Sequence, residues 1–192
     1  MPTRNQAALD FLLTRRSVPA KTMTAPVPSR DELETILSAA ARTPDHGKLE
    51  PWRFIVLERP ALERMLDQIA EAGQRLGKTD EEIAKAHSNY VNAHLAVVVV
   101  ESRIEAAKVP EIEQTYSAGA VCLALTNAAL ASGWGANWLS GWFSHDPAFC
   151  QSVWGLGAHE RVAGIIHIGT PKSDPSDRPR PDLSQKVSWI TA

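Results

Sequence analysis

The stretch Leu95–Val100 reads LAVVVV, an unbroken apolar run of strand length. A strand that faces water on one side alternates apolar and polar residues, so an unbroken run indicates a central strand that is covered on both faces. Such a strand needs other elements packed on either side of its sheet. The stretch therefore predicts a mixed domain built around one sheet.

The segments on both sides of this run alternate between helical and strand patterns. Helical spacing and capping signals predict helices over residues 4–16, 60–76, 79–91 and 111–132, a further helix that begins after Ser29, and a short one after Asp146. Aromatic and branched residues predict strands over Trp52–Glu58, Ala136–Leu139 and Arg161–Gly169. Strands separated by helices indicate an α/β or α+β sandwich around one sheet.

The stretch from Gln114 to His145 carries no Asp, Glu, Lys or Arg. Its apolar part is interrupted at residues 126–127 and 132–135, so it is shorter than the about 20 apolar residues that a membrane span needs. We expect a buried core helix here and no association with a membrane. Near the N-terminus, Arg15 and Arg16 follow the apolar patch instead of preceding it, which argues against a signal peptide.

The charge and cysteine content exclude several classes of protein. The 192 residues carry 20 Lys and Arg against 22 Asp and Glu, a formal net charge of −2, which argues against a nucleic-acid-binding protein. Cys122 and Cys150 lack the spacing of a zinc site or a disulfide framework, so we expect no metal and a reducing, cytoplasmic environment. A single domain over residues 1–192 accounts for this length.

Residues 170–192 differ from the rest of the chain. They hold four of the 13 prolines and end in the mostly apolar segment Val187–Ile190. A tail with an apolar end needs a surface that covers it. Together with the uncharged stretch from Gln114 to His145, the tail predicts an obligate homodimer in which each tail lies on the partner subunit.

Several common catalytic motifs are absent from the sequence, among them HExxH, GxSxG and the phosphate-binding GxxxxGK[ST]. Gly133-Trp134-Gly135 begins like a dinucleotide-binding fingerprint. However, Trp138 occupies the third glycine position, and the motif closes a predicted helix instead of opening one. A helix end that turns into the next strand is therefore favoured over a Rossmann loop.

Two short clusters are candidate parts of a binding site. The first is Arg15-Arg16-Ser17, expected at the point where the first helix stops, with Arg15 and Arg16 in its last turn. Its two guanidiniums and one hydroxyl suit a phosphate monoester, although a solvated cation pair would leave the same pattern. The second is Trp138-Leu139-Ser140, which combines a large flat side chain with a hydroxyl. Its alternative is an ordinary core tryptophan.

A third cluster lies on the loop between a predicted helix and a predicted strand. Arg42, His46 and Lys48 precede Trp52 on this loop. Cations beside an aromatic side chain suit an anionic aromatic ligand. The alternative is a plain surface loop.

Four motifs in a fixed order resemble the FMN-dependent nitroreductase family over nearly the whole chain, and within it the small YdjA-like branch: RRS at 15–17, R-x-P-D-H-x-x-x-x-P-W at 42–52, GWGANWLSG at 133–141 and IGTP at 168–171. The resemblance implies an α+β, nitroreductase-like fold with a central, mainly antiparallel sheet flanked by helices. It further implies a homodimer with FMN in the subunit interface and the C-terminal tail extended onto the partner. NADH or NADPH would be the electron donor, and a small aromatic acceptor, nitroaromatic or quinone-type, would be reduced.

The resemblance also implies which residues bind the cofactors. The FMN phosphate and ribityl chain would be held by Arg15, Arg16 and Ser17. A second contact stretch with the same flavin would consist of Trp138, Leu139 and Ser140. The FMN bound mainly by the other subunit would be reached by Arg42 and His46. The nicotinamide nucleotide is associated with a stretch that matches Ala128, Ala129, Leu130, Ala131, Ser132 and Gly133.

In such a protein the flavin carries the chemistry, so no catalytic side chain is expected. The nicotinamide and the acceptor would occupy one slot in turn, which predicts a ping-pong mechanism. This chain has Lys48 and Glu50 where many family members have neutral amides, and Lys48 is the candidate for a charge that favours reduced flavin. The alternatives are an FMN-binding protein without turnover, such as a carrier or sensor, and a specialised flavin dehalogenase or oxidase of the same superfamily.

Overall fold

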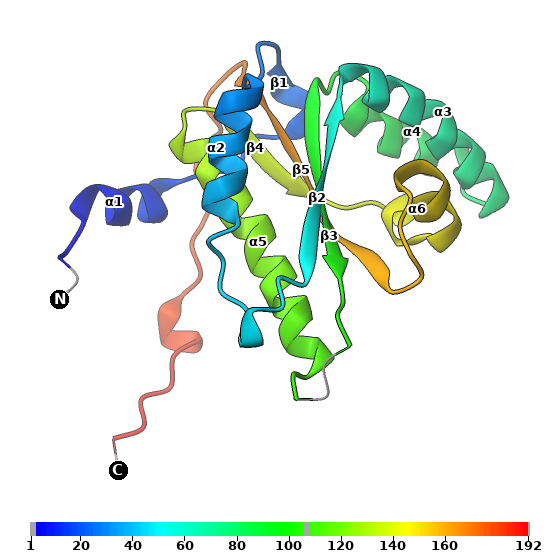
Figure 1. Cartoon of the computed structure of the whole chain (residues 1–192). Helices are drawn as coiled ribbons and strands as arrows, with labels where there is room; N and C mark the ends of the chain where they lie inside the picture. The colour runs from blue at the N-terminus through cyan, green and yellow to red at the C-terminus, as the bar shows by residue number, and fades with distance from the viewer. Residues whose placement is uncertain (1–2, 106–107, 192) are drawn as a thin grey trace.

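Within the described residues, the sheet at the centre of the molecule has five strands, and every pairing is antiparallel (Figure 1). The long strand β5 (Glu160–Pro171) lies between β3 (Leu95–Ser102) and β4 (Gly135–Leu139). At the edge beside β3 is β2 (Trp52–Glu58), and the short β1 (Met23–Thr24) pairs with the end of β5. The expected α+β fold with a mainly antiparallel sheet is confirmed.

The computed structural model describes residues 3–105 and 108–191. The predicted domain also includes positions 1, 2, 106, 107 and 192, which lie outside the described residues. Position 192 is the last residue of the predicted tail.

Helices cover both faces of the sheet (Figure 1). On one face are α2 (Arg30–Ala40) and α5 (Glu111–Ala131); on the other are α3 (Arg59–Arg75), α4 (Asp80–Tyr90) and α6 (Pro147–Trp154). The predicted helix starts are confirmed for α2 and α4, because Ser29 and Thr79 each form a capping box with the glutamate three residues later. Short strand β1 and the one-turn 3₁₀ helices were not predicted.

The apolar run in β3 is buried on both faces, as predicted. Leu95, Val97 and Val99 pack in the cluster under α2 and α5, whereas Ala96, Val98 and Val100 pack in the cluster under α3, α4 and α6. The exposed fraction of each of these six residues is 3% or less. The run therefore connects the two halves of the core.

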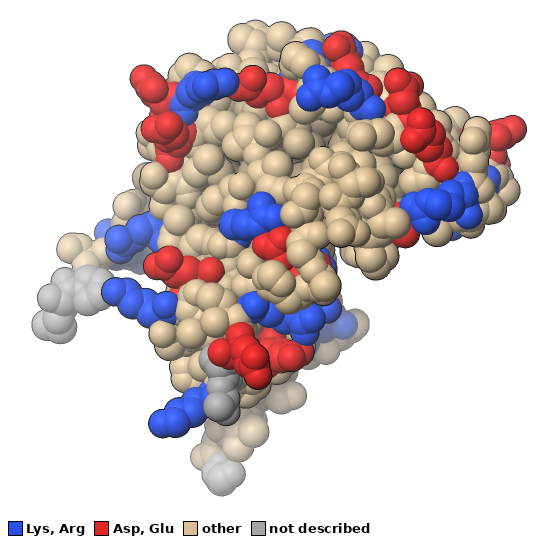
Figure 2. All heavy atoms as spheres, turned by 45° about the vertical axis from the view of Figure 1, so that its right-hand side comes forward, with Lys and Arg blue, Asp and Glu red and all other residues tan. Residues whose placement is uncertain are grey.

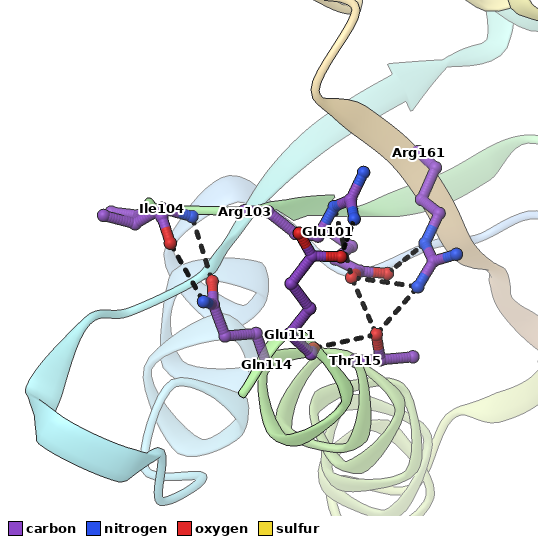
Figure 3. A network of polar contacts seen from close by, with 7 residues as sticks. All are labelled: Glu101, Arg103, Ile104, Glu111, Gln114, Thr115 and Arg161. Carbon is purple, nitrogen blue, oxygen red and sulfur yellow. Dashed lines mark hydrogen bonds and ion pairs between the residues drawn. The ribbon is translucent and has the colours of Figure 1, made fainter. Parts of the chain in front are cut away.

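A network of polar contacts links the first turns of α5 to strands β3 and β5 (Figure 3). Glu101 on β3 is 2% exposed and receives two hydrogen bonds from Arg161 on β5, at 2.5 and 3.1 Å. The hydroxyl of Thr115 on α5 lies 2.9 Å from the same carboxylate and 2.7 Å from Arg161. Gln114 binds both the backbone N–H and the carbonyl of Ile104, each at 2.9 Å. The first turns of α5 are thus fixed to two strands.

The first helix, α1 (Gln6–Thr14), ends earlier than predicted. Arg15 and Arg16 were expected in its last turn, but Arg15 has extended backbone angles (φ −53°, ψ 142°) and is the C-cap, so both arginines follow the helix. The chain needs this extended path because the next residues run beside β4. No residue of α1 is buried within the chain.

In the part of the chain that the structure describes, apolar side chains are left uncovered on α1, on the tail and on α5. Figure 1 shows α1 and the C-terminal tail extending away from the sheet and the helices that cover it. On the tail, Trp189 is 87% exposed and Ile190 is 91% exposed. On α5, which was expected to be a buried core helix, one side is buried but Ile112, Tyr116 and Leu123 are exposed. We name the exposed side the α5 stripe.

The charged side chains of the surface are mixed. On the face in Figure 2, Lys and Arg side chains lie among Asp and Glu side chains, in agreement with the net charge of −2. Across residues 3–105 and 108–191, no helix has the length and hydropathy of a membrane-spanning segment.

A buried histidine makes the fold sensitive to acid. His167 on β5 is fully buried, and neither of its ring nitrogens has a hydrogen-bond partner within the described chain. Its ring packs 4.7 Å from that of Tyr90, measured between centroids. Burial lowers the pKa of His167 from 6.5 to about 4. Between these values the unfolded chain binds a proton that the folded chain does not, so stability is lost as the pH falls.

We expect the free energy of unfolding to decrease by about 2 kcal/mol between pH 7 and pH 5 because of His167 alone. The loss should level off below about pH 4, where both states are protonated. His167→Met keeps a similar volume and removes the titrating ring, so it should abolish this part of the pH dependence. Urea unfolding of both proteins at the two pH values measures it. An equal loss of stability in the two proteins would contradict the assignment.

Candidate functional site

Two of the three candidate clusters lie side by side in the fold. The segment after α1 runs along β4, where the N–H of Val18 donates to the carbonyl of Ala136 at 3.0 Å. The amide of Asn137 donates back to the carbonyl of Val18 at 2.9 Å. Leu139 packs against the small cluster formed by Val18, Ala20 and Met23. The structure therefore brings Arg15–Ser17 next to Trp138–Ser140, although more than a hundred residues separate them in sequence.

Three guanidiniums gather after α1. Arg15 donates to the hydroxyl of Ser17 at 3.0 Å, but its Nε is buried and has no partner among the described residues. Burial lowers the pKa of Arg15 from its ordinary value, and the nearby positive charges of Arg16 and Arg180 lower it further. Arg180 comes from the C-terminal tail. Together these residues form what we name the phosphate anchor: Arg15, Arg16, Ser17 and Arg180.

The anchor carries more positive than negative charge. Asp177 is the nearby carboxylate: it lies 2.9 Å from Arg180 and 3.9 Å from Arg16. Arg16 also donates to the carbonyl of Ser176 at 3.2 Å. A buried guanidinium nitrogen without a partner is costly, and an anion with several oxygens would satisfy it. This arrangement fits a phosphate group better than it fits a solvated cation pair.

The second contact stretch, Trp138–Ser140, presents a flat indole and an exposed serine. Trp138 is 40% exposed, and its indole lies on Gly164 of β5, where a Cβ atom would collide with the ring nitrogen. Trp138 is therefore not an ordinary core tryptophan. Ser140, at the end of β4, is exposed.

Ser140 also lines a hollow of about 240 Å³ between the end of β4 and α4. Lys85, Asn89 and Tyr90 of α4 and the side chain of Trp142 also line this hollow. The hydroxyl of Tyr90 and Nε1 of Trp142 are buried without hydrogen-bond partners in the described chain. The sequence offered no signal for Lys85 or Asn89, since each reads as an ordinary polar residue of an outer helix.

The third cluster lies elsewhere in the chain. In Figure 1 the loop that precedes β2 lies apart from the segment that follows α1. Arg42, His46 and Lys48 on this loop are all exposed, and Lys48 has a positive φ of 60°. One chain therefore does not bring these residues to Arg15–Ser17. A dimer would be needed to do so, as the resemblance implies.

The stretch 128–133 is the end of α5 and the turn after it. Ala129 is fully buried, and Ala128 and Leu130 pack against the core. The exposed part consists of Ala131, Ser132 and Gly133. Gly133 has a positive φ of 86°, which glycine adopts without strain. The prediction of a helix end over a Rossmann loop is confirmed, whereas the association with a nicotinamide nucleotide stays a prediction.

Comparison with known proteins gives a consistent result. The family model described as "Nitroreductase family" matches residues 12–170. "Putative NAD(P)H nitroreductase YdjA" of Escherichia coli is 34% identical over 165 residues, which cover 86% of this chain and 88% of that protein. A "Putative NAD(P)H nitroreductase" of Haemophilus influenzae is 37% identical over 165 residues, which cover 85% and 88%. The crystal structure of a nitroreductase-like family protein from Bacillus cereus superimposes with a TM-score of 0.79 at 25% identity, over 99% of this chain and 98% of that one.

Proposed function

We propose, since this chain belongs to the nitroreductase family, that it uses FMN to transfer electrons from NADH or NADPH to nitroaromatic or quinone-type acceptors. The family and its YdjA-like branch confirm the resemblance inferred from the sequence. They also confirm the coarser prediction of an NAD(P)H-dependent flavin oxidoreductase. The acceptor class and the ping-pong mechanism are our proposals.

The observation that carries the proposal is the phosphate anchor. Arg15 is partly buried, its Nε has no partner in the described chain, and Arg16 and Arg180 add two further cations. FMN ends in a phosphate that would supply the missing acceptor oxygens. Beside the anchor, Trp138 presents a flat indole ring and Ser140 presents an exposed hydroxyl. The donor set thus suits a molecule that is a phosphate at one end and a flat ring at the other.

The chain's own residues would bind and orient the cofactor. Arg15, Arg16 and Arg180 would hold the phosphate, and Trp138–Ser140 would hold the ring. Lys85 and Asn89 would supply polar contacts where the hollow beside Ser140 opens. When bound, FMN supplies the hydride and electron chemistry. Lys48, which the fold places apart from this set, would tune the flavin only from a second subunit.

Anaerobic mixing with NADH and with NADPH tests the proposal. We expect the bound flavin to lose its yellow colour with at least one of them and to regain it with a quinone or a nitroaromatic. Steady-state rates should give parallel double-reciprocal lines, because the nicotinamide and the acceptor share one slot. Flavin that neither nicotinamide reduces would support a carrier or sensor. Reduced flavin that reacts only with a halogenated compound or with oxygen would support a specialised dehalogenase or oxidase.

We also propose a homodimer. The α5 stripe, α1 and the end of the tail expose Tyr116, Leu13 and Trp189 by 68%, 72% and 87%. Burying such surface on a second copy is favourable by about 25 cal/mol per Å². The tail, which points away from its own body in Figure 1, would lie on the partner. A hollow of about 530 Å³ beside edge strand β2, lined by Leu33, Leu37 and Val56, is the candidate surface.

Deletion of residues 183–192 should weaken the dimer and release FMN together. The deletion removes Leu183, Val187, Trp189 and Ile190, which are between 43% and 91% exposed in the single chain, and so removes the apolar contact with the partner. Light scattering and the visible absorption of the same sample measure the two effects. Gln185→Ala, a polar change in the same tail, should alter neither. A monomer that keeps its flavin would contradict the proposed assembly.

The proposed compartment is the cytoplasm. Cys122 and Cys150 are both free thiols, and a reducing compartment keeps cysteines in this state. Each subunit would form one domain, from which α1 and the tail extend.

A further inference from the structure

A histidine and a carboxylate form a close pair where the loop before β2 meets α5. Nδ1 of His46 lies 2.6 Å from Oε2 of Glu113. The two side chains are 56% and 42% exposed. Within the described chain, no hydrogen bond to the other ring nitrogen, Nε2, is formed. The pair therefore presents one imidazole nitrogen to a molecule from outside the chain.

The loop that carries His46 is held firmly. The hydroxyl of Ser117 on α5 donates to the carbonyl of Pro44 at 3.0 Å and accepts from the indole nitrogen of Trp52 at 3.1 Å. Asp45 accepts a hydrogen bond from the N–H of Leu49 at 2.5 Å. These contacts close the loop on both sides of His46, so its position does not depend on the pair with Glu113 alone.

The turn of α5 that carries Glu113 is held in place by the contacts of its neighbours. It precedes Gln114 and Thr115, which bind Ile104 and the Glu101–Arg161 pair (Figure 3). The network thus fixes the turn of α5 from which Glu113 reaches His46. A carboxylate that accepts from one ring nitrogen of a histidine orients the ring and sets which nitrogen faces outward.

The pair lies next to the surface that we assign to the dimer. Two residues of the α5 stripe lie close to Glu113 along the helix. Ile112 directly precedes it and is 52% exposed, and Tyr116 follows three residues later and is 68% exposed. In the dimer, His46 would therefore approach the partner's site. Glu113 contacts the ring directly. The charged groups that neighbour the pair in sequence are Arg42, Asp45, Lys48 and Glu50 on the loop, Glu111 on α5, and Lys108 before α5.

The proposed reaction requires a proton donor. A quinone becomes a hydroquinone by taking a hydride, which brings two electrons, and one proton. In the proposed function NAD(P)H would supply the hydride by way of bound FMN, but none of the residues assigned above would supply the proton. A positioned histidine is the commonest donor in such steps.

We propose that His46 is the acid that protonates the acceptor in the partner's site, and that Glu113 is a positioning residue for it. The Nε2–H bond of the imidazolium breaks and an O–H bond forms on the acceptor. The neutral ring then takes a proton from solvent before the next turnover. This inference rests on the proposed function, because it assumes FMN and an acceptor beside the loop of the second subunit.

Two acceptors separate proton transfer from electron transfer. The protein, saturated with FMN and reduced anaerobically with NAD(P)H, is mixed with 1,4-benzoquinone, which takes protons, or with ferricyanide, which takes electrons alone. His46→Gln should slow reoxidation by benzoquinone about 100-fold and leave reoxidation by ferricyanide within about twofold. Glu113→Gln should slow the benzoquinone reaction about tenfold, because the ring remains but is less well oriented.

A second measurement, an NMR titration of the His46 ring, does not depend on turnover. The benzoquinone rate of the unaltered protein should fall as the pH rises, with the same midpoint as a titration of the His46 ring followed by NMR. The variant His46→Gln should lose this pH dependence. The control is His145→Gln, which changes an exposed histidine in the turn after β4 and should alter neither rate. FMN affinity, measured for every variant, shows that the effects do not come from loss of the cofactor.

Two results would overturn the inference. Reduction of the flavin by NAD(P)H together with an unchanged benzoquinone rate in His46→Gln would reject the acid role alone. Equal slowing with ferricyanide and benzoquinone would also reject it, because ferricyanide needs no proton. A protein that binds no FMN, or whose flavin neither nicotinamide reduces, would reject the proposed function and this inference with it.

Discussion

Arg15→Ala should weaken FMN binding by about 10–150-fold. A charge-assisted hydrogen bond contributes about 1.5–3 kcal/mol, which corresponds to this range of dissociation constants. In the structure the Nε of Arg15 is buried without a partner in the described chain, and its Nη2 is held only by Ser17 at 3.0 Å. A phosphate would use these donors directly. Titration of FMN into the cofactor-free protein, followed by flavin fluorescence, measures the change.

Two further variants make this result specific. Arg180→Ala should also weaken binding, because Arg180 contributes to the positive charge around Arg15. Arg75→Ala removes an exposed arginine at the end of α3, on the other face of the sheet, and should leave FMN binding unchanged. Unchanged FMN affinity in Arg15→Ala, or an equal loss in Arg75→Ala, would contradict the phosphate anchor.

Arg161→Ala should lower the free energy of unfolding by about 3–5 kcal/mol. Arg161 itself is half exposed, so the effect comes from its partner: Glu101 is 2% exposed and would lose both hydrogen bonds from the guanidinium. Thr115 would remain, and Arg103 lies 4.0 Å away. A buried carboxylate without a bidentate partner is costly, because desolvation is no longer compensated. Urea unfolding at pH 7 measures the loss.

Arg30→Ala is the matched control for this prediction. Arg30 also pairs with a glutamate, Glu58, at 2.9 Å, but both side chains are largely exposed. Pairs of this kind contribute about 0–1 kcal/mol. If Arg161→Ala destabilised the protein no more than Arg30→Ala, the role of the network in fixing α5 to the sheet would be wrong.

The elements that the sequence predicts well are those with a local cause. Trp52–Glu58 has the same bounds as β2, because its aromatic and branched residues favour extended backbone. Ser29 and Thr79 were expected as helix caps, and both form the side-chain contacts that define one. Leu95–Val100 is buried on both faces, because only burial removes water from six consecutive apolar side chains.

The rest depends on contacts between distant parts of the chain. Arg180 joins Arg15 across 165 positions, and no spacing rule connects a tail with a helix end. The α5 stripe could not be separated from the buried side of α5, because Ala, Gly and other uncharged residues lie all around this helix. Arg15 and Arg16 leave α1 early because Val18 pairs with β4, a contact that helical periodicity does not contain.

The most direct test of the account is the visible spectrum of the purified protein during an anaerobic titration with NADH and NADPH. The account predicts about one FMN per chain and a flavin absorption band that disappears with at least one of the two nicotinamides. A colourless protein that takes up no FMN when the cofactor is added, or a flavin band that neither nicotinamide changes, would contradict it.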